Sequence, residues 1–188
     1  MKNLHKHFQK IVTNTDITRP ILNGIHYKEN GKIVATDSHR LLQVNIKHEI
    51  KNKTTINPLT FETYEQEYPN TDKLIPSKGE RVILNQERLQ QLFTLLKTTK
   101  KHDFLDLHFN DDSINFELEN KLKTTIYIGS HNIDIDTMRL RALYLKEATD
   151  FLTDTEHNKI ELLFISQVRP ILFTVEDQFD YLITPIRR

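Results

Sequence analysis

The stretch that decides the fold is residues 18–42, TRPILNGIHYKENGKIVATDSHRLL. Its Asn30-Gly31 pair lies between two runs of β-prone residues, and Asn-Gly is a strong signal for the tight turn of a β-hairpin. The second run ends in the sequence SHRL at residues 38–41, which gathers small, cationic and apolar side chains at one strand end. The segment therefore predicts a hairpin whose far end carries more chemistry than the fold alone requires.

Composition indicates a globular chain. Of 188 residues, 37% are hydrophobic and 28% are charged, which is typical of a folded protein rather than a disordered one. No apolar run approaches the roughly 20 residues of a membrane span, and the first ten residues lack the apolar core of a secretory signal. The absence of cysteine excludes disulfides, thiolate metal ligands and a thiol nucleophile. We expect a cytoplasmic protein.

The spacing of apolar residues along the sequence divides the chain into two parts joined by a connector at residues 51–79. Apolar residues at positions 4, 8, 11 and 12 follow helical spacing and predict a short N-terminal helix, and β-prone residues then run from about 21 to 50. Residues 51–79 contain three prolines and no sustained period, so they read as irregular. The expected organisation is a shortened domain over residues 1–79, including the connector, and a complete domain over residues 80–188.

The second half contains a repeated pattern of strand, helix and three strands. The first copy predicts strand 81–85, helix 86–98 and strands 104–109, 113–119 and 124–128. The second copy predicts strand 138–143, helix 144–153 and strands 159–165, 170–175 and 181–186. The N-terminal helix and hairpin look like a third, abbreviated copy. The expected fold class is α+β.

These motifs, in this order, resemble bacterial sliding clamps, the β subunit of DNA polymerase III. Residues 35–41, ATDSHRL, match the hairpin end of that family's second domain, and residues 19–24 match the Arg-x-x-Leu-x-Gly segment before it. Residues 68–76 are similar to its Tyr-Pro-Asp segment, and residues 181–188, YLITPIRR, to its closing motif. The resemblance implies a DNA-clamp fold of repeated β-α-β-β-β units, with antiparallel sheets and with helices on one face.

The chain also departs from the family pattern. Bacterial clamps have three domains, and this sequence corresponds to a shortened second domain plus a complete third. Family rings close by docking a first domain onto a third, so the usual dimer lacks one of its surfaces here. A homo-oligomer, possibly a trimer of two-domain chains, would still supply six domains.

The resemblance implies a hydrophobic pocket for a short peptide carried by a DNA polymerase or by other proteins with a clamp-binding motif. Anchors of this kind fill an apolar groove while strand-end polar groups fix the peptide backbone. The residues that match the pocket are Thr36, Ser38, His39, Arg40, Leu41, Pro76, Leu182, Thr184, Pro185, Ile186 and Arg187. The alternative is that Leu182 and Ile186 are core strand residues and Arg40 is a surface cation.

The resemblance also implies a DNA-facing surface, because clamp helices present basic side chains to phosphates without reading bases. The residues that suit this role are Lys2, Lys6, Lys10 and Arg19. Further basic residues on and after the second helix are Arg88, Lys97, Lys100 and Lys101, whereas Glu147 and Asp150 on the last helix oppose DNA. The formal net charge is zero, so an ordinary solvated helix face is the alternative.

Catalysis has little support in the sequence. His5 and His7 are two residues apart and point in different directions on a helix, which makes a poor metal pair. The sequence has no His-Glu-x-x-His run and no glycine loop for a phosphate, and its paired aspartates at 111–112 are typical of turns. We therefore expect no enzyme activity, no metal site and no cofactor.

Two hypotheses from different classes follow. One is a clamp-like processivity factor that encircles DNA as an oligomer and tethers replication proteins through the pocket. The other is a clamp-derived interaction module or decoy that keeps the pocket but forms no ring. The lysine-rich first helix favours the ring, and the missing first domain favours the module.

Overall fold

The computed structural model describes residues 3–12, 18–119 and 122–187. Its α-helices are α1 (Leu4–Val12), α2 (Gln86–Leu96) and α3 (Ala142–Asp154), and its short 3₁₀ segments are η1 (Pro20–Asn23) and η2 (Asp72–Leu74). The strands of the first half are β1 (Ile25–Tyr27), β2 (Lys32–Thr36), β3 (Arg40–Asn45), β4 (Thr54–Ile56) and β5 (Thr63–Tyr64). Those of the second half are β6 (Glu80–Asn85), β7 (Phe104–Phe109), β8 (Ser113–Leu118), β9 (Lys123–Tyr127), β10 (Thr137–Arg141), β11 (Lys159–Phe164), β12 (Ile171–Val175) and β13 (Phe179–Ile183).

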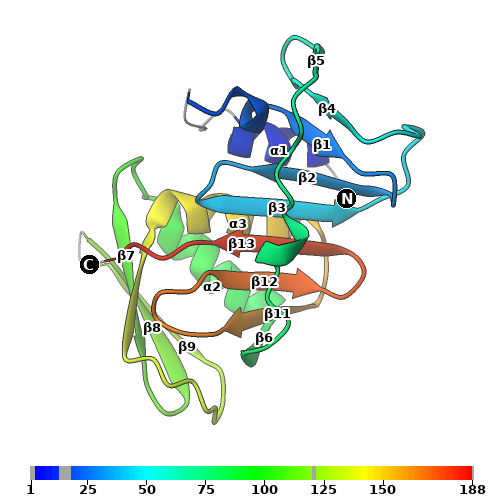
Figure 1. Cartoon of the computed structure of the whole chain (residues 1–188). Helices are drawn as coiled ribbons and strands as arrows, with labels where there is room; N and C mark the ends of the chain where they lie inside the picture. Colours follow the sequence, from blue (N-terminus) through cyan, green and yellow to red (C-terminus); the bar gives the residue numbers. More distant parts are fainter. Residues whose placement is uncertain (1–2, 13–17, 120–121, 188) are drawn as a thin grey trace.

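The strands form two antiparallel sheets (Figure 1). The larger has the order β5-β4-β1-β2-β3-β13-β12-β11-β6, and the smaller has the order β10-β7-β8-β9. The last strand, β13, pairs with β3 over five residues, so strands from the two ends of the chain meet in the middle of the larger sheet. This pairing joins the two units by backbone hydrogen bonds as well as by packing.

All three helices lie on one face of the larger sheet, behind it in Figure 1. There α1 packs against β2 and β3, while α2 and α3 pack against each other and reach the smaller sheet through β9 and β10. Successive side chains of a strand point to opposite faces, so β3 sends Leu42 and Val44 to the helices and Leu41 to the outer face. Within the described residues, no helix has both the length and the apolar composition to cross a membrane.

The structure confirms the predicted α+β class, and the second half repeats strand, helix and three strands twice. Several boundaries differ from expectation by one to three residues, most of all at α3 and β13. Helix α3 begins at Ala142 rather than at residue 144. Strand β13 ends at Ile183 rather than at residue 186, because Pro185 has no N–H to donate to a neighbouring strand. The larger sheet contains strands from both sides of the expected boundary near residue 79. The division into two domains, residues 1–79 and 80–188, remains a proposal.

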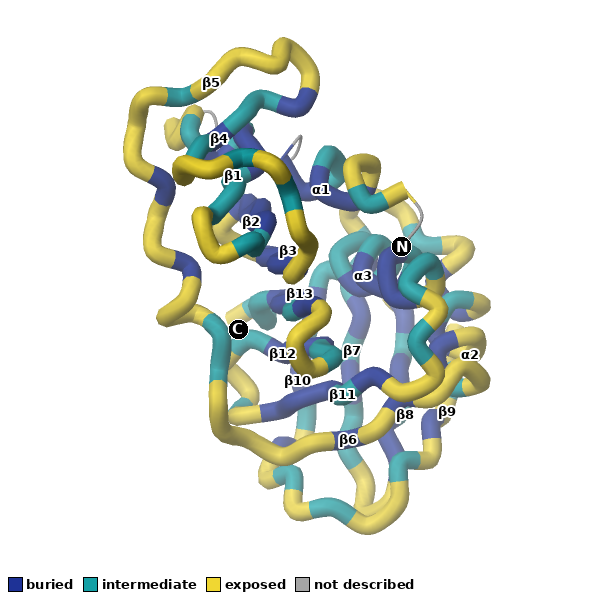
Figure 2. Tube along the Cα trace, turned by 90° about the vertical axis from the view of Figure 1, so that its right-hand side faces the viewer, coloured by how far each residue is buried: buried dark blue, intermediate teal, exposed yellow. Residues whose placement is uncertain are grey.

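The connector is less irregular than expected. Residues 54–64 form the hairpin β4–β5, and β4 extends the sheet by pairing with β1. Strands of three and two residues are too short for alternation to reveal, which explains why the sequence pattern missed them. The chain then crosses the outer face of the larger sheet, where most of its residues are exposed and a few are buried (Figures 1 and 2). The outer face is therefore partly covered.

Candidate functional site

Two of the predicted pocket segments, residues 36–41 and 182–184, meet where β3 pairs with β13. Leu41 lies opposite Leu182 in this ladder, and the pairing brings two segments together that are far apart in sequence. Just beyond it, the Thr184 N–H donates to the His39 carbonyl at 2.9 Å, and the Thr184 hydroxyl donates to the same oxygen at 3.1 Å. The two predicted walls are thus fixed to each other by backbone geometry.

An apolar cluster lies on the outer face at this junction. Its buried members are Leu22, Val34, Leu41, Tyr68, Leu163, Leu172 and Leu182, and Ile21 and Ile75 pack against it. Only Leu41 and Leu182 were among the predicted pocket residues. Pro76 is half-buried beside Ile75, at the point where the connector leaves this face. The outer-face cluster is thus a hydrophobic floor partly covered by η1 and the connector.

Sequence reasoning missed most of this floor. Leu22 was within reach, because it is the leucine of the Arg-x-x-Leu segment quoted for the resemblance. Leu163 and Leu172 pair directly across β11 and β12, and in sequence they look like any core leucine. Tyr68 was seen only as part of a connector motif. The sequence motifs could therefore have placed Leu22 and Tyr68 in the outer-face cluster, but no motif marks Leu163 and Leu172.

A tight turn shapes the polar end of this site. One carboxylate oxygen of Asp37 accepts from the backbone N–H groups of His39 at 2.9 Å and Arg40 at 2.6 Å, and the Thr36 hydroxyl donates to the Arg40 carbonyl at 2.6 Å. Ser38 is exposed at the tip with φ 72°, in the left-handed region that favours glycine. His39 is exposed and stacks on Tyr144, with ring centroids 6.1 Å apart. The turn therefore presents polar groups beside the apolar floor.

Replacing Ser38 by glycine should stabilise the protein, because glycine adopts φ 72° without steric cost. Ser38 loses only one long hydrogen bond, 3.4 Å from Arg19 to its hydroxyl. We expect S38G to raise the free energy of unfolding by roughly 0.5–1 kcal/mol, measured by urea denaturation. An unchanged or lowered midpoint would show that the turn carries no strain at this residue.

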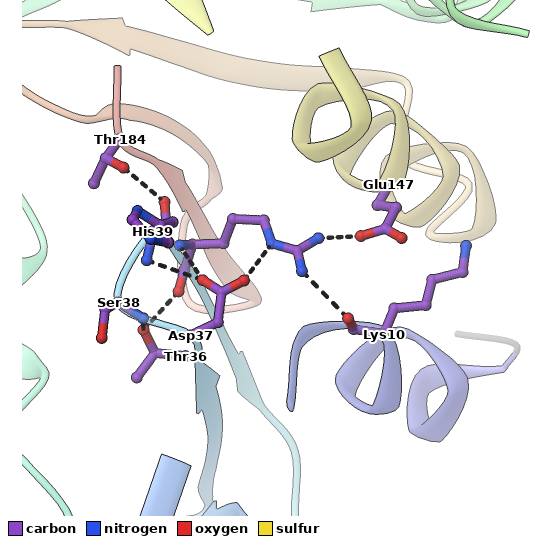
Figure 3. Close-up of polar contacts among 8 residues, drawn as sticks. Lys10, Thr36, Asp37, Ser38, His39, Glu147 and Thr184 are labelled. Carbon is purple, nitrogen blue, oxygen red and sulfur yellow. Dashed lines mark hydrogen bonds and ion pairs between the residues drawn. The ribbon is translucent and has the colours of Figure 1, made fainter. Parts of the chain in front are cut away.

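Arg40 does not stand on an open wall: its side chain is fully buried and lies on the helix face of the sheet, bonded to Asp37, Glu147 and Lys10, which Figure 3 labels. Its guanidinium donates to Asp37 at 3.0 Å, to Glu147 of α3, and to the Lys10 carbonyl of α1 at 3.2 Å. It also lies 4.4 Å from the ring centre of Tyr144. The predicted pocket cation is instead a buried bridge between β3, α1 and α3.

This network keeps Arg40 charged. Burial alone would lower the pKa of its guanidinium, but Tyr181, Asp37 and Glu147 around it raise that pKa overall. Tyr181 is itself buried, and burial raises the pKa of its hydroxyl. Glu147, expected to oppose DNA, thus has its carboxylate paired with an internal cation. A buried charge with several partners resists substitution, because removing it leaves the others unpaired.

The last predicted residues, two and three positions beyond Thr184, line a neighbouring cavity. Ile186 and Arg187, with Arg139 of β10 and Val168 of the β11–β12 loop, belong to the lining of a cavity of about 250 Å³. The Ile186 N–H donates to the Arg139 carbonyl at 2.8 Å, which anchors the C-terminal segment to the edge of the smaller sheet. Pro185 is half-buried between the two sites. The C-terminal residues thus extend the site from the outer-face cluster toward the smaller sheet.

The predicted DNA-facing residues are not equivalent. Lys2 lies outside the described residues, and Lys6 is exposed on α1. Lys10 is ion-paired with Asp150 of α3 at 2.9 Å, so the acidic residue expected to oppose DNA is offset by a lysine expected to bind it. Arg19 is exposed and reaches toward Ser38, at the groove rather than on a helix. Among the described residues, Lys6 and Lys10 lie one turn apart on α1, whereas Arg19 lies apart from them beside Ser38.

Beneath the connector, His26 stacks face to face on Tyr68 at 4.5 Å and contacts the Thr55 hydroxyl at 2.9 Å. Burial, with Lys28 and Lys53 nearby, lowers the pKa of His26 from 6.5 to about 4. A histidine whose pKa is lower in the folded state contributes stability above the pKa of the unfolded state and loses it as pH falls. The neutral form of the His26 imidazole therefore stabilises the packing of the connector on the sheet better than the charged form does.

The free energy of unfolding should accordingly fall as pH drops from 6.5 toward 4, and H26Q should reduce that slope. Carboxylates also titrate in this range, so the quantity to compare is the difference between wild type and variant in parallel denaturation curves. Superimposable pH slopes would show that His26 does not protonate on unfolding in this interval.

Among the residues that the structure describes, no group of three or more histidine, aspartate and glutamate side chains is arranged to hold a metal ion. No protein-family model and no curated protein matches the sequence.

The structure, by contrast, is similar to solved clamps. It matches the DNA polymerase sliding clamp of Bacillus subtilis with a TM-score of 0.75 at 21% identity, covering 99% of this chain and 63% of that one. It matches the β subunit of DNA polymerase from Streptococcus pyogenes with a TM-score of 0.69 at 20% identity, covering 100% and 64%. The Helicobacter pylori β clamp bound to a DNA ligase peptide matches with a TM-score of 0.71 at 18% identity, covering 98% and 63%. The chain spans under two thirds of the clamps it matches, and it has the fold of the bacterial DNA polymerase III β sliding clamp in shortened form.

Proposed function

We propose that this protein is a non-catalytic clamp that encircles DNA as a homo-oligomer and tethers replication proteins through a peptide groove on its outer face. The observation that supports this most is the convergence at β3 and β13, where Leu41 and Leu182 pair on an apolar floor. This apolar cluster adjoins the exposed polar groups of Ser38 and His39, the combination that a peptide groove requires. A polymerase or another protein with a clamp-binding motif is the expected partner, in the cytoplasm.

The groove would work by anchor-in-pocket recognition. Apolar peptide side chains would contact the outer-face cluster after displacing part of its cover, the half-buried Ile21 and Ile75. Ser38, His39 and Thr184 at the rim would fix the peptide backbone through hydrogen bonds. The Helicobacter pylori clamp was solved with a DNA ligase peptide, and a comparable peptide is the natural ligand to test here.

A fluorescent peptide of the Gln-Leu-x-Leu-Phe type should bind the protein, and I186D should weaken it. Ile186 is half-buried in the cavity beside the rim, so an aspartate there would place a charge against the apolar ligand. We expect the dissociation constant to rise about 10- to 100-fold by fluorescence anisotropy. I83D, on the edge strand β6 away from the groove, is the matched control. Equal binding by wild type and I186D would refute the placement of the groove.

DNA contact would be sequence-independent and weak. Lys6 is the exposed cation of α1, and Lys97, Lys100 and Lys101 are exposed at the end of α2. Phosphate contacts of this kind release counterions, so affinity should fall steeply with salt. Weak contact suits a ring, since retention on DNA then depends on topology rather than on affinity.

A second candidate is a clamp-derived module that binds the same peptides without forming a ring. The ion pair between Lys10 and Asp150 favours it, because it neutralises one of the cations proposed for DNA on α1. Retention on DNA separates the two candidates. A ring is retained on circular DNA and slides off once the DNA is linearised. A module that forms no ring is retained equally on circular and linear DNA.

A further inference from the structure

The sequence contains two Asn-Gly pairs, at residues 23–24 and 30–31. Asparagine is a thermolabile residue, and it reacts most readily before glycine, which has no side chain to keep the asparagine amide away from the next backbone nitrogen. The other two glycines of the chain follow Lys78 and Ile128. The two Asn-Gly pairs are identical in local sequence chemistry, so any difference in their reactivity comes from the fold around them.

Ring closure at an Asn-Gly pair needs no enzyme. Hydroxide removes the proton of the glycine N–H, the nitrogen attacks the asparagine Cγ, and a new C–N bond forms. The bond from Cγ to the side-chain nitrogen then breaks, and this nitrogen takes protons from water and leaves as ammonia. Water opens the resulting succinimide ring at either carbonyl and gives aspartate or isoaspartate. The net reaction consumes one water and releases one ammonia, with no change of oxidation state.

Asn30 is open to this reaction. It is exposed in the tight turn between β1 and β2, where the Gly31 N–H donates to the Lys28 carbonyl at 3.1 Å and Gly31 has φ 83°. A Cβ built on Gly31 would meet only the Ile46 carbonyl oxygen, at 3.6 Å. The peptide link between Asn30 and Gly31 therefore has free space around it, and hydroxide and water can reach it.

The side chain of Asn30 is folded back on the turn. Its Oδ1 accepts from the Lys32 N–H at 3.2 Å, the Asx-turn arrangement in which an asparagine bonds its own backbone two residues on. Negative charge develops on this oxygen when the Gly31 nitrogen attacks Cγ, and a backbone donor already aimed at such an oxygen stabilises that charge. The bond from Gly31 to Lys28 is lost in the reaction, but at an exposed turn water takes its place.

Asn23 is enclosed by comparison. Gly24 is buried directly after η1, and its N–H donates to the Ile21 carbonyl at 3.2 Å. A Cβ built on Gly24 would lie 2.4 Å from the Thr55 methyl group and 3.0 Å from the Tyr64 ring, so this backbone packs closely against the hairpin β4–β5. Hydroxide and water reach such a peptide link only when the structure opens locally. The shielded pair is a control within the same chain.

We infer that Asn30 is a site of spontaneous deamidation and isomerisation, and that the fold protects Asn23 from the same reaction. The inference depends on neither the groove nor the ring. Either product adds a negative charge to the turn, and isoaspartate also lengthens the backbone by one methylene group. This turn sets the register in which Tyr27 of β1 lies opposite Ile33 of β2, so the longer backbone of isoaspartate weakens the hairpin.

Peptide mapping by mass spectrometry tests the assignment. The full chain is incubated at mildly alkaline pH, either folded or unfolded in guanidinium chloride, and the acidic products at both positions are quantified over time. In the folded protein we expect Asn30 to react at least about 10-fold faster than Asn23, because Asn23 reacts only through local opening. In the unfolded protein the two rates should converge. Equal rates in the folded protein, or an Asn30 that reacts only after unfolding, would overturn the inference.

Two variants separate the chemistry from its consequence. N30S keeps a small polar residue in the exposed turn but has no amide, so it should abolish modification at residue 30 and leave the rate at Asn23 unchanged. N30D carries the new charge without the extra methylene group. We expect aged wild type, after conversion at Asn30, to unfold at a lower denaturant concentration than fresh N30D. Identical midpoints for fresh and fully converted wild type would show that this turn does not fix the register of the hairpin.

Discussion

R40A should be the most destabilising single substitution at the candidate site. The substitution leaves Asp37 buried without its cation and removes the partner of Glu147, while the Lys10 carbonyl loses a donor. Removing one member of a buried ion cluster costs about 3–5 kcal/mol, because the remaining charges are neither solvated nor paired. Chemical denaturation monitored by circular dichroism would measure the loss.

The matched control is R81A. Arg81 also pairs with a carboxylate, that of Glu161, but both side chains are about half exposed. An exposed pair contributes little, so we expect a change below about 1 kcal/mol. A further comparison is R40M/E147L, which should recover only the part of the loss that comes from Glu147, since Asp37 stays buried without its cation. Similar losses for R40A and R81A would contradict the buried bridge.

F151A should lower stability by a comparable amount for a different reason. Phe151 of α3 is fully buried where α1, α3 and β13 meet, and its ring centroid lies 5.4 Å from that of His7, 5.0 Å from that of Phe179 and 5.8 Å from that of Tyr181. Truncating a buried phenylalanine costs about 3–5 kcal/mol through lost burial and the cavity left behind. Thermal and urea unfolding should show one shared transition at a lower midpoint.

For comparison, L74A removes an exposed apolar side chain from the connector and should change stability by less than about 0.5 kcal/mol. The F151A result also reports on coupling, since α1 belongs to the first unit and β13 to the second. If only the second unit unfolded early in F151A, with α1 and its strands intact, the three helices would not form one jointly packed layer.

Much of the fold was predictable because its signals are local. The hairpin turn at residues 30–31, the helical spacing of the three helices and the repeated order of elements all appear in the sequence and in the structure. Strands β4 and β5 were not predictable, since two or three residues show no period. Their pairing depends on β1, which supplies the ladder from elsewhere in the chain.

The site was predictable in its location and less so in its contacts. The motif at residues 36–41 marked the right strand end, but a motif does not say which face each side chain takes. Alternation along β3 sends Leu41 outward and its neighbour Arg40 inward, where two acidic side chains receive it. The pairing of Lys10 with Asp150 was equally invisible, because it depends on how α1 and α3 pack.

Solution mass tests the central claim, a ring-forming clamp, most directly. Light scattering coupled to size-exclusion chromatography of the full chain gives its molar mass independently of its shape. We predict a stable species at three times the chain mass of 22.3 kDa, persisting on dilution. A monomer at every accessible concentration would contradict the ring and leave the peptide groove to act alone.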